Sequence, residues 1–525
     1  MVSKITTFGL SGTRAFRVTV ETDIERGIPY YDIVGLGSET VRESRKRIKS
    51  AILNQEFEFP PGHVVQNLAP ADIRKTGTGY DLPIAAGILK AKKGGTGATE
   101  NIGIIGELSL DGGVLPVKGV LPSVVCGREC GIFDFIVPDG NYEEALMCPG
   151  VYIYPAKDLK SAMQAADLNP EDFRKICVKM RESLKTAVES SGAADGEGSE
   201  GDDVGHYDFG DVFGQNGAKR ALEIAAAGKH NVLMTGSPGC GKTFLAKCFA
   251  GILPDMCFEE SFDVMQIYSS CGMPRRRDEI FKRPFRVIHQ GITRSALIGG
   301  GKPLEIGEAS LAHNGVLFFD ELSETPKNVI EALRQPLEEK KVYVSTYGTR
   351  EALPADFIFV GAANPCPCGN LLEKNGKCTC SPSAIAGYRS RISGAILDRI
   401  DIKIAMRSVG SDMIGGKREE PSRVIRERVV KAREIQRERY KGERFDSNGD
   451  IDNVNYVRAC SITKSSKQIL EKATDAMGLS VRSYEKIIKV ARTVADLDGR
   501  DSIRDDDILE SLSYRDLWRT GGEGF

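Results

Sequence analysis

One glycine-rich stretch constrains the fold of this chain more than any other. Residues 231–243 read Asn-Val-Leu-Met-Thr-Gly-Ser-Pro-Gly-Cys-Gly-Lys-Thr, a short apolar strand followed by a loop with three glycines. Glycines let backbone N–H groups turn toward an anion, and a helix that follows adds its positive end. The spacing matches the P-loop, whose lysine contacts the β- and γ-phosphates and whose hydroxyl binds Mg²⁺. The sequence therefore predicts an ATP and Mg²⁺ site formed by Gly236, Ser237, Pro238, Gly239, Cys240, Gly241, Lys242 and Thr243.

Two later apolar strands end in polar residues that suit nucleotide hydrolysis. Residues 315–321, Gly-Val-Leu-Phe-Phe-Asp-Glu, have the continuous apolar pattern of a buried parallel strand. We expect Asp320 to hold Mg²⁺ and Glu321 to act as the general base or to orient water. A third strand over residues 357–364 ends in Asn364, whose amide is predicted to position the attacking water.

Composition limits the class of protein without identifying it. The chain has 525 residues, 41% apolar and 27% charged, with a net charge of -2. A nearly neutral protein does not bind nucleic acid through its overall charge, so any such contact has to come from local patches. The first 21 residues alternate apolar and polar side chains as a strand does, and no apolar run reaches the length of about 18 residues that suggests a membrane span. We expect a cytoplasmic protein without membrane contact.

The pattern of strands and helices predicts an α/β protein in three folded parts. Residues 1–180 mix strands and helices as an α+β domain, and residues 181–206 contain an acidic Gly/Ser-rich run typical of a flexible linker. Residues 207–410 are predicted to form the ATPase core, with a Cys-rich insertion at 366–380. Residues 411–525 have helical spacing and are expected to form a helical lid.

Four of the thirteen cysteines cluster in that insertion. Cys366, Cys368, Cys378 and Cys380 supply enough thiolates for a tetrahedral zinc site, although the gap within each pair is one residue shorter than the usual two. Zn²⁺ is the favoured hypothesis, and a loop of reduced cysteines is the alternative. The other nine cysteines are scattered and are expected to be buried or incidental thiols, and a disulfide is disfavoured in a cytosolic protein.

The N-terminal part resembles that of a known ATPase family. The segments are Asp-Ile-Val-Gly-Leu-Gly at 32–37, Val-Gln-Asn-Leu-Ala-Pro-Ala-Asp at 65–72, Tyr-Asp-Leu-Pro-Ile-Ala at 80–85 and Gly-Glu-Leu-Ser-Leu-Asp-Gly-Gly at 106–113. They resemble the N-terminal domain of the ComM/YifB family of magnesium-chelatase-like AAA+ ATPases, a domain similar in fold to the Lon protease domain. Lon-type proteolysis needs a serine activated by a lysine. Here Thr78 falls near the nucleophile position, Leu121 occupies the lysine position and Lys118 lies three residues too early. The resemblance therefore implies a non-proteolytic module.

The rest of the chain resembles the same family nearly end to end. The resemblance rests on Arg-Pro-Phe-Arg at 283–286, Gly-Glu-Ala-Ser-Leu-Ala-His-Asn-Gly at 307–315, Ala-Ala-Asn-Pro-Cys-Pro-Cys-Gly at 362–369 and Leu-Asp-Arg-Ile-Asp at 397–401. It implies that Arg399 reaches the ATP of the neighbouring subunit, that Arg482 in the lid contacts the γ-phosphate, and that the protein is a homo-hexamer. The pair His289-Gln290 departs from the family's usual His-His.

Two locally basic segments are candidates for contact with DNA, the partner that the resemblance implies. Residues 274–286 carry several arginines, and residues 340–350 are predicted to form a hairpin between the strands that end at Asp320 and Asn364. Basic and aromatic side chains lining a pore would bind a phosphate backbone without reading its sequence. A solvated charged surface is the alternative. The expected function is ATP-driven remodelling of branched or single-stranded DNA, as in branch migration.

Two other functions remain open at this stage. One is a metal-insertion ATPase resembling the magnesium chelatase subunit, which would need a partner subunit and a tetrapyrrole substrate; the Lon-like N-terminal domain argues against it. The other is an ATP-dependent protease that uses Thr78 and Lys118.

Overall fold

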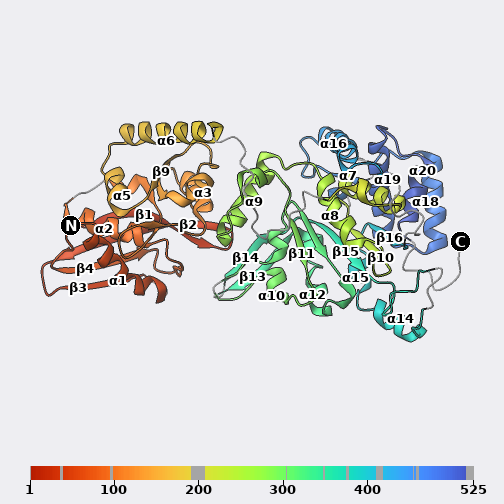
Figure 1. Ribbon diagram of the computed structural model, residues 1–525, viewed down its shortest axis with the longest axis horizontal. Helices are drawn as coiled ribbons and strands as arrows, with labels where there is room; N and C mark the ends of the chain where they lie inside the picture. Colours follow the sequence, from red (N-terminus) through yellow and green to blue (C-terminus); the bar gives the residue numbers. More distant parts are fainter. Residues whose placement is uncertain are drawn as a thin grey trace.

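The computed structural model describes residues 2–35, 39–94, 98–190, 207–302, 304–346, 349–373, 378–408, 418–452, 455–456 and 460–515. Figure 1 shows an elongated molecule with the N-terminal domain at one end, the sheet of the ATPase core in the middle and the helical lid at the other end. The greater part of the predicted linker, residues 191–206, and residues 411–417 of the predicted lid lie outside the described residues.

The N-terminal domain is built on a mixed seven-stranded sheet in the order β3-β4-β2-β1-β5-β8-β9. β1 pairs with β2 and β2 with β4 in antiparallel fashion, whereas the remaining neighbours are parallel. The strands are β1 (Ser3–Ser11), β2 (Arg14–Glu25), β3 (Tyr30–Val34), β4 (His63–Ala69), β5 (Ile102–Ile104), β8 (Asp134–Pro138) and β9 (Tyr152–Ala156), with a separate small pair β6 (Glu107–Leu108) and β7 (Val114–Leu115).

Among the described residues, six α-helices accompany this sheet. They are α1 (Glu39–Asn54), α2 (Asp81–Lys92), α3 (Val120–Glu129), α4 (Tyr142–Ala145), α5 (Leu159–Ala166) and α6 (Pro170–Ser190). α6 contacts β9, and its Phe173 and Cys177 are buried in the core of the domain. Because this packing anchors the helix, α6 extends through Ser190, ten residues into the segment predicted as linker.

The ATPase core is a five-stranded, wholly parallel sheet in the order β11-β12-β15-β10-β16. Its strands are β10 (Val232–Gly236), β11 (Phe285–Ile288), β12 (Val316–Phe319), β15 (Ile358–Ala363) and β16 (Ile402–Met406). Every residue of β10, β12 and β15 is buried. Strands covered on both faces are continuously apolar, which explains why the sequence pattern identified these three.

Helices and one hairpin complete the core. The helices are α7 (Asn216–Gly228), α8 (Lys242–Ile252), α9 (Phe258–Cys271), α10 (Arg294–Ile298), α11 (Glu308–Leu311), α12 (Lys327–Ala332), α13 (Pro336–Glu339), α14 (Pro382–Arg389) and α15 (Gly394–Leu397). The predicted hairpin is confirmed as β13 (Lys341–Thr346) paired with β14 (Thr349–Pro354).

The lid is helical, as predicted, and is tied to the core by side chains. It comprises α16 (Ser422–Arg439), the short 3-10 helix η7 (Asn448–Asp450), α18 (Lys464–Met477), α19 (Val481–Leu497) and α20 (Asp505–Ser513). Lys486 in α19 pairs with Asp401 at 2.6 Å, just before β16. Gln436 in α16 donates to the carbonyl of Ala227 at 3.0 Å.

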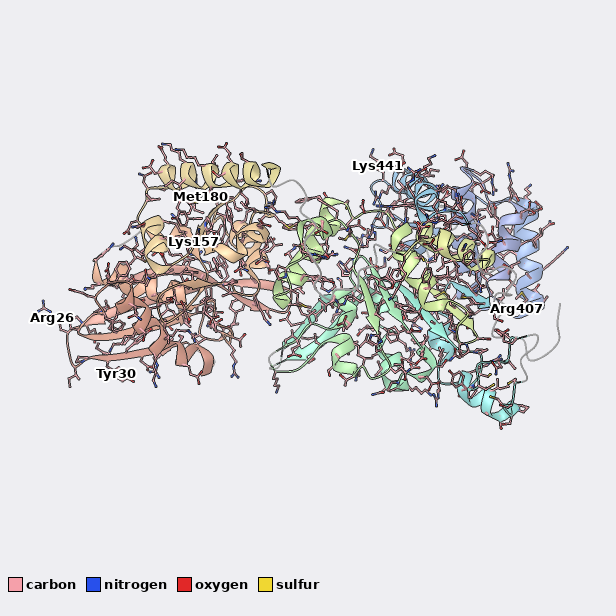
Figure 2. All side chains as sticks on the ribbon, viewed as in Figure 1. Arg26, Tyr30, Lys157, Met180, Arg407 and Lys441 are labelled. Atoms are coloured by element: carbon pink, nitrogen blue, oxygen red, sulfur yellow. The ribbon has the colours of Figure 1, made fainter. Side chains whose placement is uncertain are left out.

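The N-terminal domain contacts the core through α9, which lies between the two in Figure 1. The backbone N–H of Gly119 donates to the carbonyl of Ser269 at 2.8 Å, and Met265 is buried within the N-terminal core. Arg277 pairs with Glu143 through its Nη2 and its Nε, at 2.8 and 2.9 Å. In Figure 2, Arg26 and Tyr30 lie at the end of the N-terminal domain far from this contact.

Candidate functional site

The P-loop lies at the carboxyl edge of the parallel sheet, between β10 and α8. Gly241 precedes the helix with a φ of 91°, and Gly239 has a φ of 79°. These are left-handed conformations that favour glycine. Lys242 is therefore the first residue of α8, where helix N–H groups are free to face an anion.

Three strand ends bring the predicted hydrolytic residues together. Lys242 Nζ donates to Asn364 Oδ1 at 3.1 Å, and Thr243 Oγ1 donates to Asp320 Oδ2 at 2.9 Å. β15 lies between β10 and β12, so Asn364 follows the strand next to the P-loop strand. Parallel strands present their carboxyl ends on one edge, and that edge is where ligands bind in open α/β sheets.

The environment of Lys242 fits a phosphate. Its Nζ also donates to the carbonyls of Gly236 at 2.6 Å and Ser237 at 2.9 Å, so its hydrogen-bond acceptors are uncharged. Burial lowers the pKa of Lys242 from its ordinary value. An anion beside Nζ would favour the charged form, because an opposite charge offsets the cost of burial.

Glu321 adopts a strained backbone immediately after the strand. Its φ of 51° is in the left-handed region, which is uncommon for a residue other than glycine. Its N–H donates to Asp320 Oδ1 at 3.0 Å, and its side chain is exposed. Strain of this kind clusters at active sites, where the surrounding structure holds it. The carboxylate is thus available to a water or a ligand.

Cys240 is a packing residue of the loop. It is buried in the core of the ATPase domain, and its Sγ would lie 2.7 Å from a Cβ added to Gly236. Burial raises the pKa of its thiol. The residue fills the space under the loop that the absence of a side chain at Gly236 creates.

Both predicted arginines contact one carboxylate that sequence analysis did not single out. Arg399 Nη2 donates to Glu338 Oε2, and Arg482 Nη2 donates to Glu338 Oε1 at 3.1 Å. Arg399 is largely buried, and its hydrogen bond lowers the pKa of Glu338. Arg482 was expected at the γ-phosphate. In the structure its guanidinium pairs with Glu338 rather than with a P-loop residue.

The four clustered cysteines bring their sulfur atoms together. Cys366 and Cys368 lie 3.5 Å apart at Sγ, and Cys378 lies 3.7 Å and 3.6 Å from them. All four Sγ atoms, including that of Cys380, lie within 4.8 Å of one another. A tetrahedron with Zn–S bonds of about 2.3 Å has edges of about 3.8 Å, so the donors fit zinc.

This cysteine loop packs directly on the P-loop. A Cβ added to Gly369 would lie 2.4 Å from Cδ of Pro238, and Gly369 has a φ of 80°. Glu373, three residues after a turn at Asn370, accepts from the N–H of Ser408 at 3.1 Å. Residues 374–377 lie outside the described residues.

The first basic segment is largely neutralised inside the protein. Arg277 pairs with Glu143, Arg283 with Glu260 at 2.9 Å, and Arg286 with Glu308 at 2.7 Å. These pairs fix the turns around α9 and β11. Ion pairs within the protein therefore account for most of the positive charge in residues 274–286.

Two cations of the β13–β14 hairpin are exposed, and one of them stacks on an aromatic ring. Arg350 stacks over the ring of Tyr343, with its guanidinium carbon 4.2 Å from the ring centroid. Lys341 and Arg350 are exposed. A stacked guanidinium and ring form a surface that suits both a phosphate and a nucleobase.

The two residues considered for Lon-type proteolysis, Thr78 and Lys118, have different partners. Thr78 Oγ1 donates to the carboxylate of Glu107, whereas the side chain of Lys118 lies against Gly272 at the interdomain contact. Leu121 is fully buried. The hydroxyl of Thr78 thus binds an acid and not the amine that a Lon-type dyad requires.

Each of the three folded parts of the chain contains a segment that matches a known protein family. Residues 208–414 match the family described as "Magnesium chelatase, subunit ChlI", and residues 419–515 match its C-terminal family. Residues 20–141 match "Subunit ChlI of Mg-chelatase". No helix of the described residues is long and apolar enough to cross a membrane.

Two curated relatives align with almost the whole chain. Competence protein ComM of Haemophilus influenzae is 37% identical over 97% of this chain and 96% of its own length. YifB of Escherichia coli, described as uncharacterized, is 34% identical over the same shares. The magnesium-chelatase 67 kDa subunit of Chlorobaculum parvum is 29% identical over 30% of this chain and 23% of its own length.

Proposed function

Since the chain belongs to the ComM/YifB family of magnesium-chelatase-like AAA+ proteins, we propose that it is an ATPase that remodels DNA as a homo-hexamer. The activity we propose is branch migration or unwinding of branched or single-stranded DNA during recombination or transformation. One observation carries the ATPase part: Lys242 meets Asn364, and Thr243 meets Asp320, at one edge of a parallel sheet.

Each residue at that edge has a role in the proposed hydrolysis. Thr243 and Asp320 would hold Mg²⁺, which when bound offsets charge on the phosphate oxygens. Lys242 binds the β- and γ-phosphates. Glu321 orients the attacking water and accepts its proton, and Asn364 holds that water from the neighbouring strand end.

The homo-hexamer is supported by the position of Arg399. Arg399 binds Glu338 and the carbonyl of Ala395, and among the described residues it has no hydrogen bond to the P-loop of its own chain. A planar cation that stabilises charge on phosphate is a common part of such sites, supplied within the chain or by a neighbour. We infer that in a ring each P-loop receives Arg399 from the adjacent subunit.

DNA is the proposed substrate, and the β13–β14 hairpin is its proposed contact. The stacked Arg350 and Tyr343 support this choice, whereas the paired arginines of 274–286 do not. Binding through the hairpin would depend on salt and tolerate any sequence.

We also propose that Cys366, Cys368, Cys378 and Cys380 bind Zn²⁺, and that the protein works in the cytoplasm. The sulfur separations match the edges of a zinc tetrahedron. None of the thirteen cysteines, all of which lie among the described residues, forms a disulfide, as is usual in a reducing compartment.

A metal-insertion ATPase has less support. The magnesium-chelatase 67 kDa subunit aligns with 30% of this chain, whereas ComM aligns with 97%. Capture of a large porphyrin-binding partner from a cell extract would favour the metal-insertion function.

ATP turnover with a panel of DNA structures tests the proposal. We expect single-stranded DNA or a branched junction to raise the rate, and Glu321→Gln to abolish turnover while nucleotide binding persists. Turnover that ignores every DNA, together with no DNA binding at low salt, would contradict the proposed substrate. Casein degradation would revive the protease hypothesis.

A further inference from the structure

Glu338 occupies an unusual position between two cations. It lies in α13, and its two carboxylate oxygens accept hydrogen bonds from Arg399 and Arg482. Arg399 follows α15 of the core, whereas Arg482 lies in the first turn of α19 in the lid. One acid therefore holds together the two arginines proposed to act on nucleotide.

The arrangement of Arg399 leaves one of its donors unsatisfied. Its Nη1 donates to the carbonyl of Ala395 at 2.7 Å and its Nη2 to Glu338, but its Nε is buried without a partner among the described residues. The side chain of Arg399 is 10% exposed, against 54% for Arg482. Because an exposed ion pair contributes little to stability, the Glu338–Arg399 pair is stronger than the Glu338–Arg482 pair.

The segment that carries Glu338 leads directly into the proposed DNA contact. α13 ends at Glu339, and β13 of the hairpin begins at Lys341. Lys340, between them, pairs with Asp450 of the lid at 2.5 Å and with Asp356 at 3.3 Å. Lys229 contacts the same two acids at 2.9 Å and 2.8 Å.

Residues 338–340 therefore connect three parts of the motor. Glu338 contacts Arg482 in α19, and Lys340 contacts Asp450 in η7, so the base of the hairpin is tied to the lid at two points. A displacement of β13 would act on both ties, because packed segments shift as units. The same displacement would act on the pair between Glu338 and Arg399.

We propose that Glu338 is a positioning residue that keeps Arg399 and Arg482 bound to its carboxylate, and that DNA pulling on the β13–β14 hairpin releases Arg399 to the neighbouring subunit's ATP and Arg482 to the γ-phosphate. Carboxylate and phosphate compete for the same planar guanidinium donors, so the two contacts of Arg399 exclude each other. This inference rests on the proposed function, because it requires both DNA stimulation and an arginine that acts across subunits.

The test compares DNA-free and DNA-saturated turnover in the full-length protein. Glu338→Gln keeps the size of the side chain and removes the charge. We expect its DNA-free kcat to rise several-fold, its stimulation by a branched DNA to fall toward onefold, and its KM for ATP to remain that of the wild type. Glu338→Ala should also raise the DNA-free kcat and reduce the stimulation by DNA, as Glu338→Gln does.

Two further variants make the result specific. Glu339 is also an exposed acid of α13, and its carboxylate accepts from Gln335 Nε2 rather than from an arginine, so Glu339→Gln should leave the DNA-free and the DNA-saturated rates unchanged. Adding Arg399→Ala to Glu338→Gln should remove the gain, because the released arginine is its cause.

A fall in DNA-free kcat with an unchanged DNA stimulation in both Glu338 variants would overturn the proposed role of Glu338. A rise in DNA-free kcat that persists when Arg399→Ala is added would overturn it as well. Thermal melting and ATP-dependent assembly of each variant confirm that folded rings are compared. If wild-type turnover ignores DNA, or Arg399→Ala alone is fully active, the proposed function itself fails. A different result would contradict only the proposed role of Glu338: DNA stimulates the wild type, Arg399→Ala is inactive, and Glu338→Gln responds to DNA as the wild type does.

Discussion

Thr243 Oγ1 donates to Asp320 Oδ2 at 2.9 Å, a contact between residues 77 positions apart in the chain. The hydroxyl belongs to the second residue of the helix after the P-loop, and the carboxylate follows β12, which is separated from β10 by one strand, β15. The two oxygens lie as close together as neighbouring ligands of a small cation do, which is the arrangement that Mg²⁺ requires in a P-loop ATPase.

Asp320→Asn should impair the use of Mg²⁺ more than the binding of nucleotide. Replacing the anionic ligand removes a charge opposite the metal, whereas Lys242 and the loop N–H groups remain. We expect turnover to fall by about 10²-fold or more and the Mg²⁺ needed for half-maximal rate to rise. Magnesium titrations of turnover and a fluorescent nucleotide check this. Loss of nucleotide binding without Mg²⁺ would indicate a damaged loop instead.

Arg399→Ala should lose about 10³-fold in kcat, the range typical of arginine fingers. Mixing tests whether the arginine acts across subunits. Arg399→Ala subunits retain an intact P-loop, and Lys242→Ala subunits retain the arginine, so mixed rings should recover activity that neither variant has alone. An inactive mixture, with mixed assembly shown by native mass spectrometry, would contradict action between subunits.

Cys378→Ser should release zinc and weaken ATP binding. Three remaining thiolates bind zinc less tightly than four, and the loop that they organise packs on Pro238 through Gly369. We expect about one zinc per wild-type chain by elemental analysis and much less in the variant. Cys130→Ser is the matched control, because Cys130 is exposed and outside the cluster. Equal metal content in all three proteins would exclude the site.

Gly369→Ala should weaken ATP binding while zinc remains bound. The new methyl group would meet Pro238 Cδ at 2.4 Å, and a φ of 80° is unfavourable for alanine. The P-loop must then shift. We expect a higher KM for ATP with unchanged zinc content. A Gly387→Ala control, at a position where an added Cβ meets nothing within 4 Å, should behave as the wild type.

Acid should destabilise the fold through two buried histidines. Burial lowers the pKa of His230 and of His313 from 6.5 to about 4. Between these values the unfolded chain takes up protons that the folded chain does not, so stability is lost as pH falls from 6.5 toward 4. Each site contributes about 3 kcal/mol at most to that loss.

The loss of stability in acid is tested by comparing the melting temperatures of the wild type and His230→Gln at pH 7 and pH 5. The variant should show a smaller drop, although it loses the contact with Thr493 Oγ1 at 2.8 Å and so melts lower at pH 7. Asp81, whose pKa burial raises to about 6, acts in the opposite direction but equally in both proteins. An identical drop in both would exclude His230 as a cause.

The sequence by itself determined the P-loop, the acids Asp320 and Glu321 after the apolar strand that became β12, and the amide at Asn364. Each is a short motif at the end of a strand whose continuous apolar run identifies it, because a parallel sheet buries both faces of its strands. The family was also evident from sequence, since its motifs extend along nearly the whole chain.

Tertiary structure alone decided how the charged residues pair. Nothing near Glu338 in the sequence marks it as the partner of Arg399 and Arg482, which lie 61 and 144 positions away. The arginines of 274–286 look like a surface for DNA until the fold pairs Arg277, Arg283 and Arg286 with acids of distant segments or neighbouring turns. Charge pairing depends on which surfaces packing brings within a few ångströms, and short-range sequence patterns do not encode that distance.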